Sequence, residues 1–194
     1  GAPYLLQKGR GGYRMGHDRV FDHMMLDGLE DAYEPGRSMG TFGEDCAAKY
    51  GFTREQQDKF AQASVQRAQD AIKSGAFKDE ITPVTVKDRK GERVVDTDEG
   101  PGKINIDKIP TLKPAFKKDG TVTAAASSSI NDGAAAMVMM RESTAKKLGV
   151  KPLARIVSHA THAQEPEWFS TAPIGATEKA LAKAGWKVDD VDLW

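Results

Sequence analysis

The second half of the sequence alternates short apolar runs with helical segments, and this alternation restricts the fold more than any other feature. Helices are predicted at 143–148 and 175–184, and a glycine follows each one, where a left-handed residue ends a helix. Short strands are predicted at 134–140, 153–158 and 191–194. This β-α-β-α-β order is typical of a layered α/β core. The last strand stops almost as soon as it begins, so we expect the chain to be a fragment.

The first half is predicted to consist mainly of helices and loops. Residues 1–19 are rich in glycine and basic side chains, which is typical of a loop. Apolar residues at helical spacing predict a helix over 20–33, which a nearby proline is expected to end. Runs of β-forming residues at 81–86 and 93–96 predict a hairpin, and residues 103–120 are predicted to be an extended loop.

Two capping boxes predict the starts of two further helices. Thr41 is followed by Glu44, and Thr53 by Gln56, which is the spacing of a capped helix N-terminus. The stripe expected to be buried on the second helix is mostly small, so another element is predicted to pack closely against it. The residues of that stripe are Phe60, Ser64, Ala68 and Ile72.

Composition and charge exclude several classes of function. Hydrophobic residues make up 39% and charged residues 29% of the chain, a balance typical of a soluble globular protein. Basic and acidic side chains number 28 each, so the net charge favours neither a nucleic-acid partner nor a membrane surface. The longest apolar run, 134–140, is far shorter than the ~20 residues of a membrane span. Because Cys46 is the single cysteine, no internal disulfide can form, and a cytoplasmic location is predicted.

The residues alone predict no catalytic group and no metal site. Cys46 lies beyond the first turn of its predicted helix, beside Glu44 and Asp45, whose charges disfavour a thiolate, so we interpret it as structural and expect it to be buried. His159 and His162 would point to opposite faces of a strand and so would not share an ion. The sequence contains no G-x-S-x-G motif, phosphate-binding loop or dinucleotide fingerprint.

A stretch of small residues, Ala124 to Ser129, follows the strand-like residues 121–123. Small side chains let a ligand approach the backbone, and serine hydroxyls can hydrogen-bond the amides of a ligand. A flexible turn explains the same composition equally well, so the residues alone leave both interpretations open.

Several short stretches, in order along the whole chain, resemble the thiolase family. The most specific is GTVTA at 120–124, which runs on to NDGAAA at 131–136. The others are RGGYRMG at 10–16, LDGL at 26–29, SMGT at 38–41, TREQQD at 53–58, KPAF at 113–116, PIGA at 173–176 and AGW at 184–186. No single stretch is decisive, and the specificity comes from their order and spacing.

The resemblance implies an α/β fold in which two similar core domains are joined by a long loop domain that covers the active site. Residues 1–130 would be the loop domain, a helical and hairpin region. Residues 131–151 would end the first core domain and 152–194 would open the second, giving an incomplete β-α-β-α-β core. The implied activity is acyl transfer between coenzyme A thioesters by Claisen condensation or thiolysis. Substrates of the acetyl-CoA and acetoacetyl-CoA type, no covalent cofactor, and a homo-oligomer (dimer or tetramer) are expected.

The resemblance also implies that the chain binds coenzyme A and supplies no catalytic residue. The family's nucleophilic cysteine would precede this chain. A second cysteine, the histidine of a Gly-His-Pro motif and the asparagine of an Asn-Glu-Ala-Phe motif would follow it. Seven residues match the family's coenzyme A pocket, namely Leu29, Ser38, Met39, Phe116, Ala124 and Ser128 around the pantetheine and adenine, and Phe169 near the acyl end.

Some positions of this pocket differ from relatives. Ser38 replaces a histidine of some polymer-synthesising relatives, and Ala126 replaces an asparagine of the serine-rich loop. Pro101 and Gly102 stand where others have an arginine near the nucleotide phosphates, which makes Lys103 the candidate for that role. Two alternatives give the chain no part in catalysis: a segment that only binds coenzyme A, or one that serves assembly. The candidate contact for assembly is the basic, glycine-rich segment 8–25, with His23, Met24 and Met25.

Overall fold

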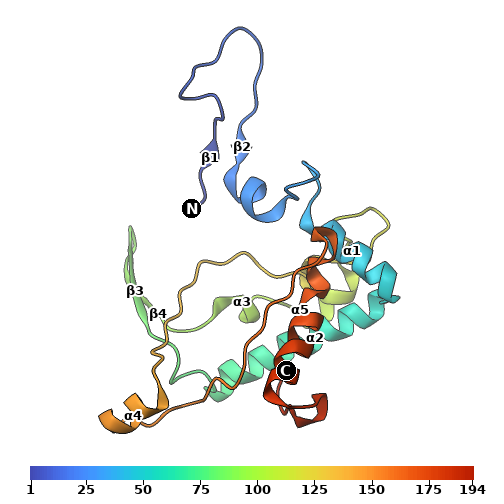
Figure 1. Ribbon diagram of the computed structural model, residues 1–194. Coiled ribbons are helices and arrows are strands. Elements are labelled where there is room, and N and C mark those ends of the chain that lie inside the picture. The colour runs from blue at the N-terminus through green and yellow to red at the C-terminus, as the bar shows by residue number, and fades with distance from the viewer. The chain divides into compact units, whose positions relative to one another are not determined.

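The computed structural model describes all residues, 1–194, and divides into two compact units, Gly1–Ser129 and Ile130–Trp194 (Figure 1). The first unit contains helices and two small hairpins, and the second contains helices without strands. None of the helices is both long enough and apolar enough to cross a membrane.

The longest helix of the first unit, α2 (Arg54–Ser74), begins as the sequence predicts. The Thr53 hydroxyl accepts a hydrogen bond from the backbone N–H of Gln56 at 3.2 Å, and the Gln56 side chain accepts one from the backbone N–H of Thr53 at 2.8 Å. This capping box is therefore confirmed. Gly75 ends the helix with φ 72°, and Gly51 ends the preceding helix with φ 68°, both in the left-handed region as expected.

Helix α1 (Met39–Tyr50) begins earlier than predicted, and the expected capping box of Thr41 and Glu44 is wrong. Ser38 is the N-cap, because its hydroxyl accepts from the N–H of Gly40 at 3.4 Å. The Thr41 hydroxyl donates to the Ser38 carbonyl at 2.7 Å. The Glu44 carboxylate instead accepts from backbone donors 77 residues further along the chain, so a tertiary contact replaces the local cap.

The N-terminal segment differs from the predicted loop and helix. Tyr4–Leu5 (β1) pairs antiparallel with Phe21–Asp22 (β2), which leaves the rest of residues 1–19 irregular. Met25–Leu29 forms a helical turn, η1 of π type, preceded by two helical residues, so the predicted helix over 20–33 is wrong outside 23–29. None of the η1 residues is buried. A short helix without tertiary packing gains too little to extend.

The predicted hairpin is confirmed. Val84–Asp88 (β3) pairs antiparallel with Gly91–Val95 (β4), and the register runs from Val84 opposite Val95 to Asp88 opposite Gly91. Both strands reach closer to the turn than the sequence indicated. Residues 103–120, predicted to be an extended loop, contain one 3-10 helix. The helical turns that follow β4 in this unit are α3 (Glu99–Gly102), η2 (Ile106–Thr111) and η3 (Ala124–Ala126).

The apolar core of the first unit lies where α2 meets η2 and η3. Ala61, Val65 and Ile109 are buried against one another. The predicted close packing on α2 is confirmed, but the buried face is rotated by one residue, because Phe60 is 75% exposed. Two partly buried residues complete the cluster, Ile106 and Ala125.

Polar side chains of α2 fix the irregular segment that follows the hairpin. Arg54 Nη2 donates to the carbonyl of Leu112 at 2.8 Å, and Gln69 Nε2 donates to the carbonyl of Pro101 at 2.8 Å. Between them, Gln62 donates to a carbonyl of η2 at 3.3 Å. These bonds supply partners to backbone carbonyls that no sheet or long helix would satisfy.

The second unit contains the two predicted helices, α4 (Glu142–Leu148) and α5 (Ala172–Ala184), and each ends at a glycine as expected. Two short 3-10 helices accompany them, η4 (Pro166–Thr171) directly before α5 and η5 (Val188–Asp190) after it.

The three predicted strands of the second half, 134–140, 153–158 and 191–194, do not form in this structure. A strand needs a neighbouring strand to pair its backbone groups, and the second unit holds none. Their apolar side chains are accordingly exposed, 86% for Val138. Part of the chain before η4 lies along α5 instead, since the Ser158 hydroxyl donates to the carbonyl of Ala180 at 2.7 Å.

Candidate functional site

Two stretches of the first unit that the resemblance singled out lie side by side. Pro114 and Thr123 form an antiparallel bridge, and the N–H of Ala115 donates to the carbonyl of Val122 at 2.9 Å. The KPAF and TVTA stretches therefore pair with each other as one small antiparallel ribbon rather than forming separate loops.

Helix α1 holds this ribbon through a buried carboxylate. Glu44, only 7% exposed, accepts from the N–H of Thr121 at 3.0 and 2.8 Å and from the N–H of Val122 at 2.8 Å. The Thr121 hydroxyl adds a bond to Glu44 at 3.2 Å and accepts one from Gln57 of α2 at 2.8 Å. Thr121 is thus held from both helices, and Val122 from α1.

The small-residue stretch is an ordered turn, not a flexible one. Thr123 is fully buried, and its carbonyl accepts from the N–H of Ala126 at 3.1 Å and from the hydroxyl of Ser127 at 2.8 Å. These bonds form η3 and direct the chain past α2, with Ser128 exposed at the end of the turn.

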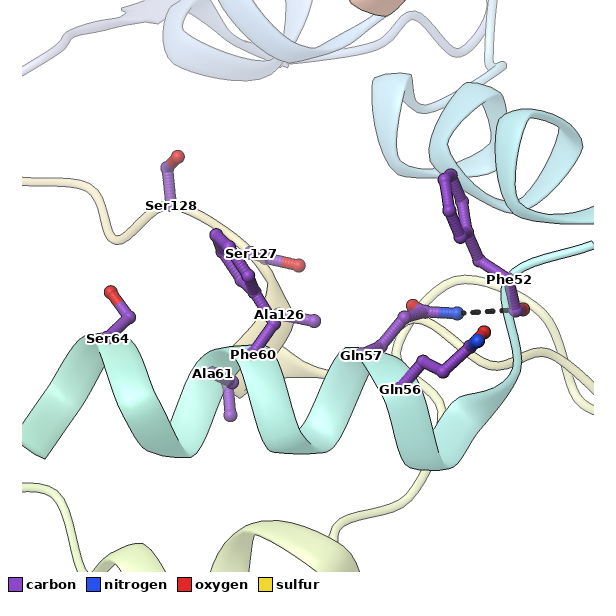
Figure 2. Close-up of a pocket in the computed structure, with 10 residues that line it drawn as sticks. Phe52, Gln56, Gln57, Phe60, Ala61, Ser64, Ala126, Ser127 and Ser128 are labelled. Atoms are coloured by element: carbon purple, nitrogen blue, oxygen red, sulfur yellow. Dashed lines mark hydrogen bonds between the residues drawn. The ribbon is translucent and has the colours of Figure 1, made fainter. Parts of the chain in front are cut away.

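A cavity of about 670 Å³ lies between this turn and the N-terminal half of α2 (Figure 2). Its volume is within the range of small-molecule sites, about 300–1,000 Å³. In Figure 2 the hydroxyls of Ser64 and Ser128 point to the same side. The lining residues are Phe52, Gln56, Gln57, Phe60, Ala61, Ser64 and residues 125–128.

The lining combines apolar surface with a few hydrogen-bonding groups. The rings of Phe52 and Phe60 are largely exposed, so they are available to a ligand. Gln57 is already engaged, because its amide nitrogen also donates to the carbonyl of Phe52 at 3.4 Å. The available groups therefore suit a ligand with alternating apolar and amide parts, and no charged side chain lines the cavity.

The structure brings only part of the predicted set to this cavity. Ser128 lines it, and Ala124 begins the turn beside it. The other predicted residues lie elsewhere, with Leu29 half-buried in η1, Ser38 and Met39 half-buried at the start of α1, Phe116 packed on Gly40 of α1, and Phe169 exposed in η4 of the second unit.

Sequence reasoning missed the aromatic wall of the cavity. Phe60 was predicted to belong to the buried stripe of α2, and Phe52 was not considered. The available signal was their spacing: two phenylalanines lie around the capped start of a helix that also carries Ser64. The small-residue turn was identified as a candidate, with its role left open.

Lys103, the candidate for the nucleotide phosphates, is occupied by an internal partner. Its Nζ lies 3.0 Å from a carboxylate oxygen of Glu99, four residues earlier. This hydrogen bond, with the positive charges of Lys103 and Arg93, lowers the pKa of Glu99. Both groups of the pair are largely exposed.

Cys46 is half-buried in α1, not fully buried as a structural cysteine was expected to be. The earlier start of α1 places it still further from the N-terminus of the helix. His162 packs against Gly175 of α5. No group of three or more His, Cys, Asp or Glu side chains is arranged to hold a metal ion.

Comparison with known proteins gives consistent matches. Family models match over residues 1–143 (thiolase, N-terminal domain) and 150–194 (thiolase, C-terminal domain). An acetyl-CoA acetyltransferase of Pseudomonas aeruginosa is 49% identical over 194 residues, 99% of this chain and 49% of that relative. A probable acetyl-CoA acetyltransferase of Dictyostelium discoideum is 50% identical, over 99% of this chain and 46% of its own length. The chain thus spans about half the length of the curated relatives it matches.

Solved structures agree with the sequence matches. The crystal structure of the Bacillus anthracis acetyl-CoA acetyltransferase has a TM-score of 0.92 and 41% identity, over 98% of this chain and 48% of that one. The acetyl-CoA acetyltransferase of Syntrophomonas wolfei has a TM-score of 0.87 and 40% identity, over 99% and 48%. The predicted fold class, an α/β thiolase-like chain, is confirmed. With one model covering residues 1–143 and the other 150–194, the chain belongs to the thiolase family.

Proposed function

We propose that this chain is the coenzyme A-binding part of an acetyl-CoA C-acetyltransferase. The whole enzyme would transfer acyl groups between coenzyme A thioesters, by Claisen condensation or by thiolysis. The observation that carries the proposal is the cavity edged by Ser127 and Ser128, since it lies on the stretch that most resembles the family. The relatives called acetyl-CoA acetyltransferase or probable acetyl-CoA acetyltransferase match along 99% of the chain, which supports the same activity for the whole protein.

The chemistry of the cavity matches the pantetheine arm. That arm is long and narrow, and its amides alternate with methylene groups. The rings of Phe52 and Phe60 offer apolar contact to the methylene groups, and the hydroxyls of Ser64 and Ser128 offer hydrogen bonds to the amides. The acyl group would then extend beyond the cavity, toward residues of the full-length enzyme.

The catalytic groups that make and break bonds are proposed to be residues of the whole enzyme other than 1–194. Residues 1–130 would act as the loop domain, 131–151 as the end of the first core domain and 152–194 as the start of the second. Cys46 is not proposed as the nucleophile, because it lies well past the first turn of α1, where the helix dipole no longer favours a thiolate. The whole protein is proposed to be cytoplasmic.

Calorimetry of the 194-residue chain with coenzyme A tests the binding proposal. We expect weak but measurable binding at millimolar coenzyme A. Free pantetheine should bind as well, whereas 3′,5′-ADP should not. Ser128→Ala should weaken binding about fivefold, the effect of one lost hydrogen bond. Ser143→Ala, at an exposed position of α4, is the matched control and should bind like the wild type. Absence of heat with millimolar coenzyme A would contradict the proposal.

A second role, in assembly, is favoured by the N-terminal arm. The β1–β2 pair ends in a basic, glycine-rich loop, and Tyr4, Met15 and Val20 expose most of their apolar surface. We propose that this arm contacts a second copy of the chain in a dimer or tetramer. Deleting residues 1–19 should lower the sedimentation coefficient by more than the lost mass explains. Unchanged association after the deletion would remove this role.

A further inference from the structure

Glu44 is an unusual carboxylate for the interior of a small unit. It is almost fully buried, and it takes part in none of the ion pairs of the chain. A buried carboxylate without hydrogen bonds or a cation is costly. Here the donors are two backbone N–H groups and one hydroxyl, all from Thr121 and Val122. The hydrogen bonds of Glu44 therefore fix the backbone of two consecutive residues.

Gly120 leaves the space that this carboxylate occupies. A Cβ atom on Gly120 would lie 2.1 Å from Oε1 of Glu44, which is far inside contact distance. The φ of Gly120 is not in the left-handed region, so space and not backbone conformation is what requires glycine here. Glu44 and Gly120 form one fitted contact, although they lie on different segments.

Hydrogen bonds and consecutive residues connect this contact to the cavity. The N–H groups of Thr121 and Val122 are held by Glu44, and Thr123 follows with its side chain fully buried. The Thr123 carbonyl then fixes Ser127, whose neighbour Ser128 faces the cavity. A shift at Glu44 would therefore move the cavity's serine edge.

We propose that Glu44 is a positioning residue for coenzyme A: it sets where the Thr121–Ser128 segment lies, and so where Ser128 meets the ligand. The proposal rests on the proposed function for the identity of the ligand. Glu44 does not touch the ligand itself, because it does not line the cavity.

Amide hydrogen exchange of the 194-residue chain without ligand gives the first test. In Glu44→Gln, one carboxylate oxygen is replaced by an NH₂ group that cannot accept from a backbone N–H. We expect exchange at 121–128 to become about tenfold faster, while exchange of the α2 amides is unchanged. Gly120→Ala should produce the same local pattern by displacing the carboxylate, and it replaces Glu44→Gln if that variant does not fold. Glu55→Gln, an exposed carboxylate of α2, is the matched control.

Coenzyme A affinity gives the second test. Glu44→Gln and Gly120→Ala should each raise the dissociation constant about tenfold. The double variant should be no worse than either single one, because both disrupt the same contact. Glu44→Asp keeps both oxygens on a shorter stem and should restore part of the affinity.

The outcomes separate the two proposals. Unchanged exchange at 121–128, or faster exchange throughout the first unit, overturns positioning by Glu44. Local acceleration with unchanged coenzyme A affinity overturns it as well. A wild-type chain that binds no coenzyme A refutes the proposed function, while the exchange data still decide whether Glu44 fixes the segment.

Discussion

The ring of Phe116 fills the space that a side chain on Gly40 would need. A Cβ atom on Gly40 would lie 2.2 Å from the Cγ and Cδ1 atoms of that ring. Gly40 is in the first turn of α1, and Glu44 follows one turn later on the same helix. One face of α1 therefore receives both sides of the ribbon, with Phe116 docked at Gly40 and Val122 held at Glu44.

Gly40→Ala is expected to destabilise the first unit, and Gly43→Ala is not. Alanine at position 40 overlaps the Phe116 ring, which costs about 1–3 kcal/mol, more than the ~1 kcal/mol that alanine gains in a helix. At position 43 the new Cβ would lie 3.8 Å from a methyl group of Val122, an ordinary contact, so only the helical gain remains. Urea unfolding of both variants checks this. Equal stability of the two would show that the ring moves aside freely.

Arg54 is expected to be the most sensitive charged position on α2. Its Nε bonds both carboxylate oxygens of buried Asp58 at 2.9 and 2.8 Å, while Nη2 bonds the carbonyl of Leu112. Arg54→Ala leaves these acceptors without a donor and should lower the free energy of unfolding by about 2–3 kcal/mol. Arg54→Lys should recover little of this loss, because one ammonium group cannot reach both sites.

The control for Arg54 is Lys59→Ala, which removes an exposed ion pair with Glu55. Exposed pairs contribute about 0–1 kcal/mol, so denaturant unfolding should hardly change. If the Arg54 and Lys59 variants lost similar stability, the role of Arg54 as an anchor for the segment after the hairpin would be untenable.

Acid–base titration is expected to detect the pairing of Lys103 with Glu99. The pKa of Glu99 is lowered from its ordinary value of about 4.5, first by the hydrogen bond from Lys103 and then by charge. Lys103→Ala should raise that pKa toward the ordinary value, as NMR titration of the carboxyl carbon would report. Since the folded-state pKa is depressed, the pair stabilises the fold fully above the ordinary pKa of a glutamate, and this contribution disappears as pH falls through the depressed pKa.

The 194-residue chain is expected to catalyse no thiolysis of acetoacetyl-CoA. The single thiol, Cys46, sits in a helix away from the cavity residues, and thioester exchange requires a reactive thiolate. A spectrophotometric assay of thioester cleavage measures this directly. Turnover above background that Cys46→Ser removes would assign the nucleophile to this chain.

Local signals in the sequence predicted local structure well. The Thr53–Gln56 box and the glycines that end α1 and α2 depend on neighbouring residues only, and they are found where expected. Glu44 was interpreted as a cap because its real partners, Thr121 and Val122, are far away in sequence. The strands predicted after residue 130 fail for a related reason, since pairing depends on strands this structure does not contain.

The candidate site was predictable only in part. The small-residue turn at 124–129 was recognised from composition, and the bonds to Thr123 show that it is ordered, while its contact with a ligand stays a prediction. Phe60 was missed because an exposed aromatic residue on a helix resembles a core residue in sequence, and Phe52 lies in the short loop before α2, where no pattern marks it. All of the predicted coenzyme A contacts, Ala124 and Ser128 included, came from family resemblance and stay predictions.

Helix α2 holds residues 101–112 through main-chain oxygens, because the side chains of Arg54, Gln62 and Gln69 all donate hydrogen bonds to carbonyls there. These bonds do not depend on the side chains of the residues whose carbonyls accept them. Apart from the core residues Ile106 and Ile109, the side chains between 101 and 112 can therefore change without loss of these bonds. Inserting or removing one residue would instead shift every later carbonyl away from its donor.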